Sequence, residues 1–505
     1  MIGEWHEAHC APHYSRVTIA IHKMHLLHQI DQWARLAPDR PAHISGARTL
    51  TWRELIARAD AFAAWLDLEL GENRAPIVVR GHKEPEMLVA FLGTVQSGRP
   101  YVPIDVSIPE QRAQRIIATA QAARVLTPEH VAQASAEGRG LRRVEGCDPF
   151  YILFTSGSTG EPKGVVITLA NLEHFVAWML AEQRFADGEV FLNQAPFSFD
   201  LSVMDLYCCL ATGGTLFSIT KEHVANPKTL YEAFRKSGIT TWVSTPSFAA
   251  MCLVEKTFDQ AMLPALKRFL FCGETLAPET AAQLLDRFPQ AEVWNTYGPT
   301  EATVATTSIR ITREVLAQWN PLPVGSVMPG TRIEILGEDG KPVPPGERGE
   351  IIIAGPNVSP GYLGREDLTA RAFFDEAGSR AYRTGDWGRD RDGQIFFEGR
   401  IDGQIKLHGY RIELGDLEAN LRALPEIADA VVLPVEKDGH VDSLAAFIVL
   451  AVEKSGSDFE MSARLKTRLA ERLPAYMVPR KFHFLETFPM TPNGKADRRK
   501  LAERL

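Results

Sequence analysis

The sequence has few cysteines and no long apolar run. Its 505 residues include six cysteines, which form no Cys-x-x-Cys pair and show no repeating spacing. A disulfide framework or a cysteine-based zinc site is therefore not expected, and reduced thiols in a cytoplasmic protein are the simplest interpretation. No stretch approaches the roughly 20 apolar residues that a membrane-spanning helix requires, so we expect no membrane insertion.

Positive charge is also scarce. The chain carries 55 Lys and Arg against 63 Asp and Glu, which gives a formal net charge of −8. A broad basic face is therefore excluded, and we predict no nucleic-acid partner. Residues 1–23 carry acids and histidines and lack the basic start and apolar centre of a secretory signal. We interpret residues 1–23 as a disordered or misassigned start, with Met24 as the natural beginning.

From Met24 to about Pro321, strand-like and helix-like segments alternate. Thr51 and Glu54 have the spacing of a capping box, which predicts a helix from there to about Leu70. Apolar segments at 76–79, 101–104, 190–194, 215–219 and 240–243 are separated by helical patterns such as 85–96, 109–123 and 201–210. Strands separated by helices predict the α/β class, with doubly wound and mostly parallel sheets.

The pattern changes twice in the second half of the chain. After Pro321, glycine and proline become dense, and short alternating segments at 332–336 and 350–354 predict a β-rich subdomain. A glycine-rich stretch at 399–418 precedes a segment with strand and helix signals of its own. We therefore predict a large domain at residues 24–401 and a small, mobile α+β domain at residues 402–505.

One loop concentrates small and hydroxyl residues. Residues 151–164 read YILFTSGSTGEPKG, an apolar strand followed by glycines, hydroxyls and one lysine. Such loops point backbone N–H groups and hydroxyls at a phosphate, and a nearby lysine neutralises its charge. The spacing does not fit the Walker loop, because Lys163 is followed by glycine and a β-branched run rather than by Ser or Thr and a helix. A flexible polar turn is the alternative interpretation.

The loop resembles the phosphate loop of the adenylate-forming enzymes, a family that includes acyl-CoA synthetases, luciferases and the adenylation domains of peptide synthetases. Further matches follow in the family's order at residues 101–105, 295–301, 361–363, 382–386, 399–400 and 492–495. The resemblance runs from Met24 to the C-terminus. It implies that a carboxylate is joined to the α-phosphate of ATP with release of pyrophosphate, and that Mg²⁺ assists.

The resemblance also implies the nucleotide contacts. They are Thr155, Ser156, Gly157, Ser158, Thr159 and Lys163 at the phosphates, Asn295, Thr296, Tyr297, Gly298, Pro299 and Thr300 around adenine and phosphate, and Asp386, Phe397, Gly399, Arg400 and Lys495 nearer the ribose and α-phosphate. Glu301 would hold the metal. Taken singly, each has a plainer interpretation: Asp386 as a turn aspartate, Tyr297 as a core aromatic, Glu301 as a helix cap. Glu398 departs from the pattern and is expected to add negative charge near the ribose.

Lys495 is the catalytic residue that the resemblance implies. It would lie between the substrate carboxylate and the α-phosphate and offset their charge. Asp402 stands at the family's hinge, about which the C-terminal domain would turn so that residues 406–410 replace Lys495 during a second reaction with a thiol. An ordinary interdomain linker is the alternative interpretation of this glycine-rich stretch.

The predicted substrate is a small amino acid. Asp200 stands where amino-acid-activating members bind the substrate ammonium, although it also precedes a predicted helix and would suit a cap. The match is closer to members that ligate D-alanine to carrier proteins. There Cys272, Val304 and Lys495 would complete the pocket, with Cys272 reducing it to methyl size; a small buried hydrophobe is the alternative for Cys272. The implied partner is a phosphopantetheinylated D-alanyl carrier protein, feeding the D-alanylation of teichoic acids.

Two other functions stay open at this point. A stand-alone adenylation enzyme for another small amino acid in secondary metabolism would share the same motifs and differ only in the Asp200 and Cys272 pocket. A non-catalytic nucleotide-binding protein would also retain the fold. The presence of Lys163, Glu301, Asp386 and Lys495 together counts against that second alternative.

Overall fold

The computed structural model describes residues 25–134, 136–138, 140, 143–157, 161–401, 403–407, 410–437, 440–451, 456–490 and 496–505. These residues form two compact units. The first comprises the described residues up to 105 together with 120–153 and 164–401, and the second comprises 106–119, 154–163 and 402–505. The division into domains at residues 24–401 and 402–505 stays a prediction.

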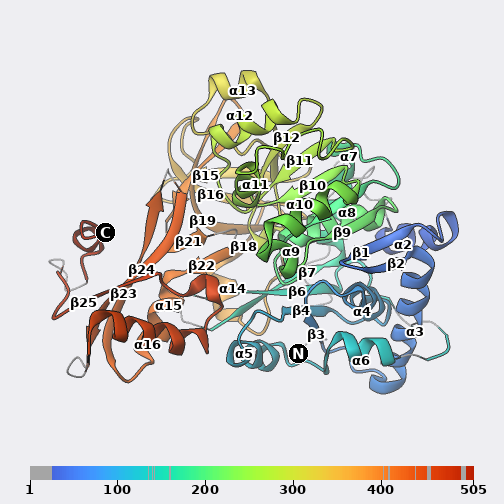
Figure 1. Cartoon of the computed structure of the whole chain (residues 1–505), viewed down its shortest axis with the longest axis horizontal. Coiled ribbons are helices and arrows are strands. Elements are labelled where there is room, and N and C mark those ends of the chain that lie inside the picture. The colour runs from blue at the N-terminus through green and yellow to red at the C-terminus, as the bar shows by residue number, and fades with distance from the viewer. Residues whose placement is uncertain are drawn as a thin grey trace. The chain divides into compact units, whose positions relative to one another are not determined.

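A nine-stranded sheet forms the centre of the first unit (Figure 1). In order across the sheet, its strands are β14 (Ser326–Val327), β13 (Thr307–Ile311), β12 (Glu292–Tyr297), β11 (Arg268–Phe271), β10 (Thr241–Ser244), β8 (Val190–Asn193), β9 (Thr215–Ser218), β1 (Pro41–Ser45) and β2 (Arg48–Thr51). Neighbours from β12 to β1 run parallel. Only the edges are antiparallel, so the predicted mostly parallel sheet is confirmed.

A second, six-stranded sheet lies in the same unit. Its strands are, in order, β17 (Gly361–Tyr362), β7 (Lys163–Thr168), β6 (Pro149–Thr155), β4 (Tyr101–Asp105), β3 (Ile77–Gly81) and β5 (Arg124–Leu126). The run from β6 to β5 is parallel, and β17 pairs antiparallel with β7. The last residues of β6, the first of β7 and the loop between them count with the second unit.

Helices alternate with these strands along the chain. They are α2 (Leu26–Leu36), α3 (Trp52–Leu70), α4 (Pro85–Gln96), α5 (Glu110–Ala120), α6 (Pro128–Gln133), α7 (Leu169–Gln183), α8 (Leu201–Ala211), α9 (Lys221–Ala225), α10 (Pro227–Ser237), α11 (Pro246–Leu253), α12 (Pro278–Arg287), η1 (Thr300–Ala302), α13 (Arg313–Gln318) and α14 (Glu366–Ala372). Strand neighbours point to opposite faces: Leu270 joins the core with α7 and α8, while Phe269 and Phe271 join the core with α10 to α12. The helices therefore cover both faces of the nine-stranded sheet.

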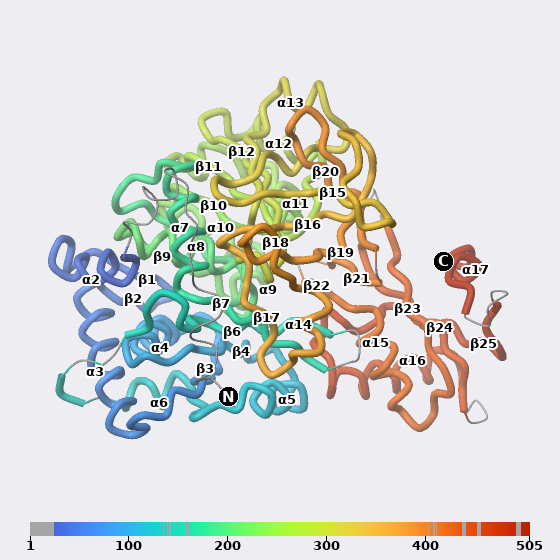
Figure 2. The backbone as a smooth tube through the Cα atoms, turned by 180° about the vertical axis from the view of Figure 1, so that it is seen from behind, coloured from blue at the N-terminus to red at the C-terminus, as the bar shows by residue number. Residues whose placement is uncertain are grey.

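The predicted β-rich subdomain is an antiparallel five-stranded sheet. Figure 2 shows its strands in yellow and orange: β15 (Arg332–Leu336), β16 (Gly349–Ala354), β19 (Ser379–Arg391), β18 (Phe373–Glu376) and β20 (Gln394–Arg400). The strand β20 pairs with β19, and Asp386 lies opposite Arg400 in that register. This pairing places a carboxylate and a guanidinium side by side at one end of the subdomain.

The C-terminal residues of the second unit have their own α+β core. Its elements are β21 (Gln404–Leu407), β22 (Tyr410–Glu413), α15 (Leu414–Arg422), β23 (Ile427–Lys437), β24 (His440–Leu450), α16 (Asp458–Ala470), η2 (Ala475–Met477), β25 (Lys481–Leu485) and α17 (Arg498–Ala502). Leu417 and Leu421 of α15 pack with Leu465 of α16 and Ile448 of β24, and all four are buried. This separate core agrees with the predicted small α+β domain.

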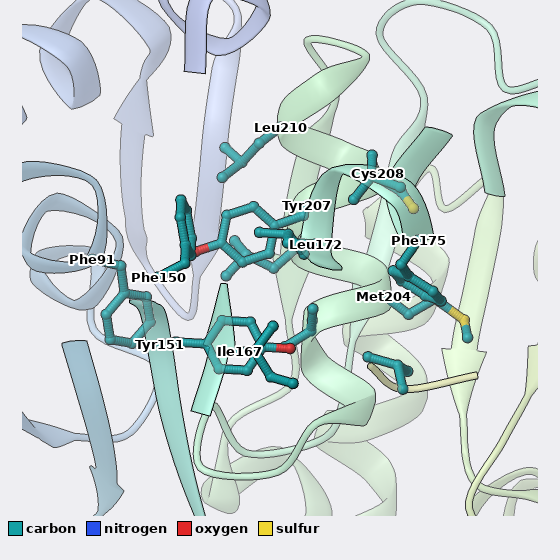
Figure 3. Close-up of a cluster of buried hydrophobic side chains, with 14 of the residues drawn as sticks. Phe91, Phe150, Tyr151, Ile167, Leu172, Phe175, Met204, Tyr207, Cys208 and Leu210 are labelled. Atoms are coloured by element: carbon teal, nitrogen blue, oxygen red, sulfur yellow. The ribbon is translucent and has the colours of Figure 1, made fainter. Parts of the chain in front are cut away.

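Aromatic rings fill the core of the first unit between β4, β6 and α8. Figure 3 shows Phe150, Tyr151 and Tyr207 clustered there with Phe91. The two hydroxyls of Tyr101 and Tyr207 are buried and share a hydrogen bond of 2.7 Å. Burial of each such ring contributes about 1.5–3 kcal/mol, and the shared hydroxyl pair avoids the cost of two unsatisfied polar groups.

The capping box at Thr51 is confirmed. Thr51 Oγ1 accepts from the Glu54 backbone N–H at 3.3 Å, and the Glu54 carboxylate accepts from the Thr51 backbone N–H at 2.9 Å. This reciprocal pair begins helix α3, which ends at Leu70 as predicted. Among the described residues, no helix is both long enough and apolar enough to cross a membrane.

The cysteines follow the prediction at four described positions. Cys208, Cys209, Cys252 and Cys272 are free and buried. Burial raises the pKa of the Cys208 thiol, so it stays protonated and unreactive. Cys147 is disulfide-bonded, and the expectation of reduced thiols throughout is wrong there.

Candidate functional site

The predicted residues of the first unit gather at the carboxyl ends of the parallel strands. Asp200 lies in the connection after β8, Cys272 follows β11 directly, and Thr300 to Val304 follow β12. In open α/β sheets, ligands bind where the carboxyl ends of the strands meet. The sheet order β12-β11-β10-β8 brings these connections to one edge.

Asp386 joins two sheets through its carboxylate. Its Oδ1 accepts from Arg400 at 2.6 Å, and its Oδ2 accepts from the Tyr297 hydroxyl at 2.5 Å. Burial and the Asp386 charge raise the pKa of Tyr297 well above its ordinary value, so the phenol stays a donor. Asp386 is therefore not a solvated turn aspartate but a buried acceptor between β12 and β19.

Tyr297 also lies beside an aromatic ring from the β-rich subdomain. Its ring centroid is 5.9 Å from that of Phe397, with the planes tilted by 35°. Both positions were predicted to lie near the nucleotide. Gly399 has a φ of +104° with no atom near an added Cβ, so backbone conformation rather than space favours glycine there. An adenine ring could stack on these rings, and that role stays a prediction.

Asn295 and Thr296 use their side chains to hold the strand end. The Asn295 amide donates to the Pro323 carbonyl at 2.9 Å, and the Thr296 hydroxyl donates to the Phe271 carbonyl at 2.8 Å. Gly298 is required by a close approach, because an added Cβ would lie 2.6 Å from Ala305 Cα. These contacts fix the backbone at the end of β12, where the sequence predicts recognition of adenine.

Asp200 does not cap the helix that follows it. Its backbone is in the helical region, and its side chain makes no capping hydrogen bond to α8. Instead, its Oδ2 accepts from the Thr300 hydroxyl at 2.6 Å. The capping alternative is therefore not supported, and the carboxylate is held toward the residues after β12, where an ammonium group would find a partner.

Cys272 and Val304 contact one another, and their role in one substrate pocket stays a prediction. The Cys272 Sγ donates to the Val304 carbonyl at 3.6 Å, and both residues are buried. Thr303 and Val304 have positive φ values of 55° and 70°. Such a conformation in β-branched residues costs on the order of 1–3 kcal/mol each and clusters at functional sites.

Glu301 is fully buried and is the predicted metal ligand. Its Oε1 accepts from the Tyr362 hydroxyl at 2.8 Å, and its backbone carbonyl accepts from Ser359 at 2.9 Å. The described residues contain no group of three or more His, Cys, Asp or Glu side chains that could hold a metal ion. A single carboxylate fits Mg²⁺, which keeps waters and takes further oxygens from phosphates.

Glu398 does not leave uncompensated charge near the predicted ribose site. Its carboxylate accepts from Arg389 at 2.9 Å and lies 3.6 Å from Arg348. The charge that this residue adds is therefore paired with two arginines of the same subdomain.

The glycine and hydroxyl loop belongs to the second unit. Ser156 is buried and its hydroxyl accepts from the Glu413 backbone N–H at 3.2 Å. Gly157 is required, because an added Cβ would lie 2.3 Å from the Glu161 carbonyl. Thr155 ends β6 and Lys163 begins β7, so the loop joins two strands as predicted.

Four predicted residues lie outside the described part of the chain: Ser158, Thr159, Asp402 and Lys495. Pro299 precedes η1 in an extended conformation. The roles assigned to all these positions stay predictions.

Lys83 is a residue that sequence reasoning missed. It is 1% exposed, and its ammonium donates to Asn193 Oδ1 at 2.5 Å and to the Ala195 carbonyl. Asn193 in turn donates to Asp205 at 2.8 Å. Burial lowers the pKa of Lys83 to about 7, while the nearby Asp205 opposes that shift. This network fixes the segment between β8 and Asp200. The only sequence signal for it was a single lysine shortly after a predicted buried strand.

Replacing Lys83 with methionine should lower the free energy of unfolding by about 1–3 kcal/mol. The change leaves the Ala195 carbonyl without its Lys83 donor, whereas Asn193 Oδ1 still accepts from the Ser218 hydroxyl at 2.8 Å. Urea denaturation measures the loss. The matched control is Lys221→Met, because Lys221 is half-exposed and pairs with Asp105 at 3.0 Å; it should cost less than about 1 kcal/mol. Equal losses in both variants would contradict the role given to Lys83.

The chain is similar to known proteins along most of its length. A family model described as AMP-binding enzyme matches residues 30–146 and 140–363, and one described as AMP-binding enzyme C-terminal domain matches 416–495. The D-alanine–D-alanyl carrier protein ligase of Bacillus cereus is 47% identical over 498 residues, covering 95% of this chain and 99% of that protein. The ligase of the same name from Bacillus anthracis is 46% identical over 497 residues, with the same coverage of both chains.

Solved structures agree in fold. The Vibrio cholerae adenylation domain AlmE, in complex with glycyl-adenosine-5′-phosphate, has a TM-score of 0.82 at 21% identity and covers 95% of this chain and 98% of that one. The o-succinylbenzoate CoA synthetase of Bacillus subtilis has a TM-score of 0.83 at 21% identity, covering 94% and 98%. With family models matched along most of its length, the chain belongs to the adenylate-forming, AMP-binding enzyme family.

Proposed function

We propose that this enzyme activates D-alanine with ATP and transfers the aminoacyl group to the phosphopantetheine thiol of a carrier protein. The observation that carries the proposal is the near full-length identity of 46–47% to relatives named D-alanine–D-alanyl carrier protein ligase. The contact between Asp200 and Thr300 supports an amino-acid substrate, because it holds a partly buried carboxylate where an ammonium group could bind. An acetate or fatty-acid substrate has no ammonium group to offer this carboxylate.

In the first reaction, a D-alanine carboxylate oxygen bonds to the α-phosphorus and pyrophosphate departs. Asp200 holds the substrate ammonium, and Cys272 and Val304 enclose the methyl group. Asp386 accepts from the ribose hydroxyls, and Tyr297 stacks against adenine. Glu301 would hold Mg²⁺, which would supply positive charge beside the phosphates, and Lys163 and Lys495 neutralise the remaining charge.

In the second reaction, the carrier's thiolate bonds to the acyl carbon and AMP departs. Asp402 would be the hinge about which the C-terminal domain turns between the two reactions. We place the enzyme in the cytoplasm, where ATP is available, and predict that the loaded carrier feeds the D-alanylation of teichoic acids.

ATP–pyrophosphate exchange tests the proposal, with D-alanine, L-alanine, D-serine, glycine and acetate compared in parallel. We expect strong exchange with D-alanine, weaker exchange with the other amino acids and none with acetate. A pocket of this kind discriminates one methylene by only about 10–200-fold, so some exchange with glycine is expected. A dominant response to another amino acid would instead favour an enzyme of secondary metabolism, and a lack of exchange with all five would contradict adenylation.

A further inference from the structure

The backbone between η1 and β13 contains a strained tight turn. The Ala305 N–H donates to the Thr303 carbonyl at 2.9 Å, which closes a three-residue turn around Val304. Val304 has a φ of 70°, and Thr303 before it has a φ of 55°. A γ-turn with positive φ is rare even for permissive residues, and a β-branched centre makes it more strained. Such a turn persists only where its surroundings fix it.

Asn357 surrounds this turn with hydrogen bonds. Its side-chain amide donates to the Ala302 carbonyl at 3.0 Å and to Thr306 Oγ1 at 3.1 Å, one on each side of the turn. Its backbone carbonyl accepts from the Thr303 hydroxyl at 2.7 Å. Asn357 is itself fully buried, and Thr331 orients its amide by donating to Oδ1 at 2.7 Å.

The turn that Asn357 holds forms part of the predicted amino-acid pocket. The Val304 carbonyl accepts from Cys272, so the turn and the end of β11 are linked directly. On the far side, the next residue, Ala305, packs against Gly298, where no side chain would fit. Val304 is therefore fixed between the strand ends β11 and β12, and a shift of the turn would move the wall formed by Val304 and Cys272.

We propose that Asn357 is a positioning residue for substrate selection: it keeps the Thr303–Val304 turn in its strained conformation and thereby sets the shape of the pocket that accepts D-alanine. The inference rests on the proposed function and extends it to a residue outside the pocket. It follows that loss of the Asn357 side chain lets the turn relax toward negative φ. The pocket then fits D-alanine less closely and excludes L-alanine less well.

The test is ATP–pyrophosphate exchange with D-alanine and L-alanine for the wild type and for Asn357→Ala. We expect the ratio of kcat/KM for D-alanine over L-alanine to fall by roughly tenfold or more, which is the scale that methyl-sized fit supplies. The KM for D-alanine should rise while the KM for ATP changes by less than about twofold. If Asn357→Ala does not fold, Thr331→Val removes only the hydroxyl that orients the amide and should give a smaller change in the same direction.

Asn171→Ala is the matched control. The Asn171 amide donates to the Pro356 and Val358 carbonyls at 2.7 and 3.1 Å, so it holds the same segment without touching the turn. It should lower stability and keep the ratio. An unchanged ratio in both Asn357→Ala and Thr331→Val, or an equal fall in Asn171→Ala, would overturn the inference. A wild type with no preference for D-alanine would instead overturn the proposed function itself, and the wild-type measurement alone reveals that case.

Discussion

Replacing Asp386 with alanine should lower kcat/KM for ATP by about 10³-fold. The carboxylate is buried, and we propose that its oxygens accept from the ribose hydroxyls when the nucleotide binds. Hydrogen bonds to a charged group contribute about 1.5–3 kcal/mol each, and about 4 kcal/mol corresponds to 10³ in rate. Part of the loss would come from the protein, because Arg400 and Tyr297 would lose their shared acceptor. Removing one member of such a buried pair costs about 3–5 kcal/mol.

The two contributions can be separated with 2′-deoxy-ATP. In the wild type, loss of the 2′-hydroxyl should lower kcat/KM by about 10- to 150-fold, which corresponds to one hydrogen bond to a charged group. In the near-isosteric Asp386→Asn variant, the same change of nucleotide should lower kcat/KM much less, because the carboxylate that would accept from the 2′-hydroxyl is absent. Thermal denaturation of both proteins measures how much of the loss comes from a less stable fold. If the deoxynucleotide penalty were equal in wild type and variant, Asp386 would not contact the ribose.

Lys495→Ala should lower the rate of adenylate formation by about 10²–10³-fold. The reaction brings a carboxylate and a phosphate together, and removal of one preorganised positive partner at such a centre typically costs this much. Binding of ATP should change far less, since most of the predicted nucleotide contacts come from other residues. The measurement is single-turnover formation of D-alanyl adenylate.

Lys500→Ala is the control for this variant. Lys500 lies in the same basic tail, is 62% exposed and pairs loosely with Asp497 at 3.9 Å. Its loss should leave the rate unchanged. A second measurement starts from prepared D-alanyl adenylate, which Lys495→Ala should still transfer to the carrier at nearly the wild-type rate. An unchanged first reaction in Lys495→Ala would remove this lysine from the mechanism.

The sequence predicted those features that local patterns determine. The alternation of strands and helices follows from apolar periodicity, and the helix from Thr51 to Leu70 follows from its capping box. The candidate residues were located by ordered motifs rather than by any single residue. Of these, the contacts of Tyr297 with Asp386 and of Cys272 with Val304 place predicted partners together.

Long-range features escaped prediction because nothing local signals them. Lys83 and Asn193 are 110 residues apart, and neither stands in a recognisable motif. The hairpin of β1 and β2 joins the sheet beside β9, far along the chain. The positive φ of Val304 could not be predicted from the sequence either. A β-branched residue favours extended backbone, and only the surrounding structure imposes the turn.

The position of the candidate pocket residues has a consequence for how such an enzyme changes its specificity over evolution. Asp200, Cys272 and Val304 all lie beyond the last paired residue of a strand, yet Cys272 and Val304 also belong to the same buried apolar cluster as Leu270. Selection for a new substrate can therefore change the half-buried Asp200 with little effect on core packing, whereas a change at Cys272 or Val304 also alters the core. In the proposed pocket, substrate choice and fold stability are thus coupled at Cys272 and Val304.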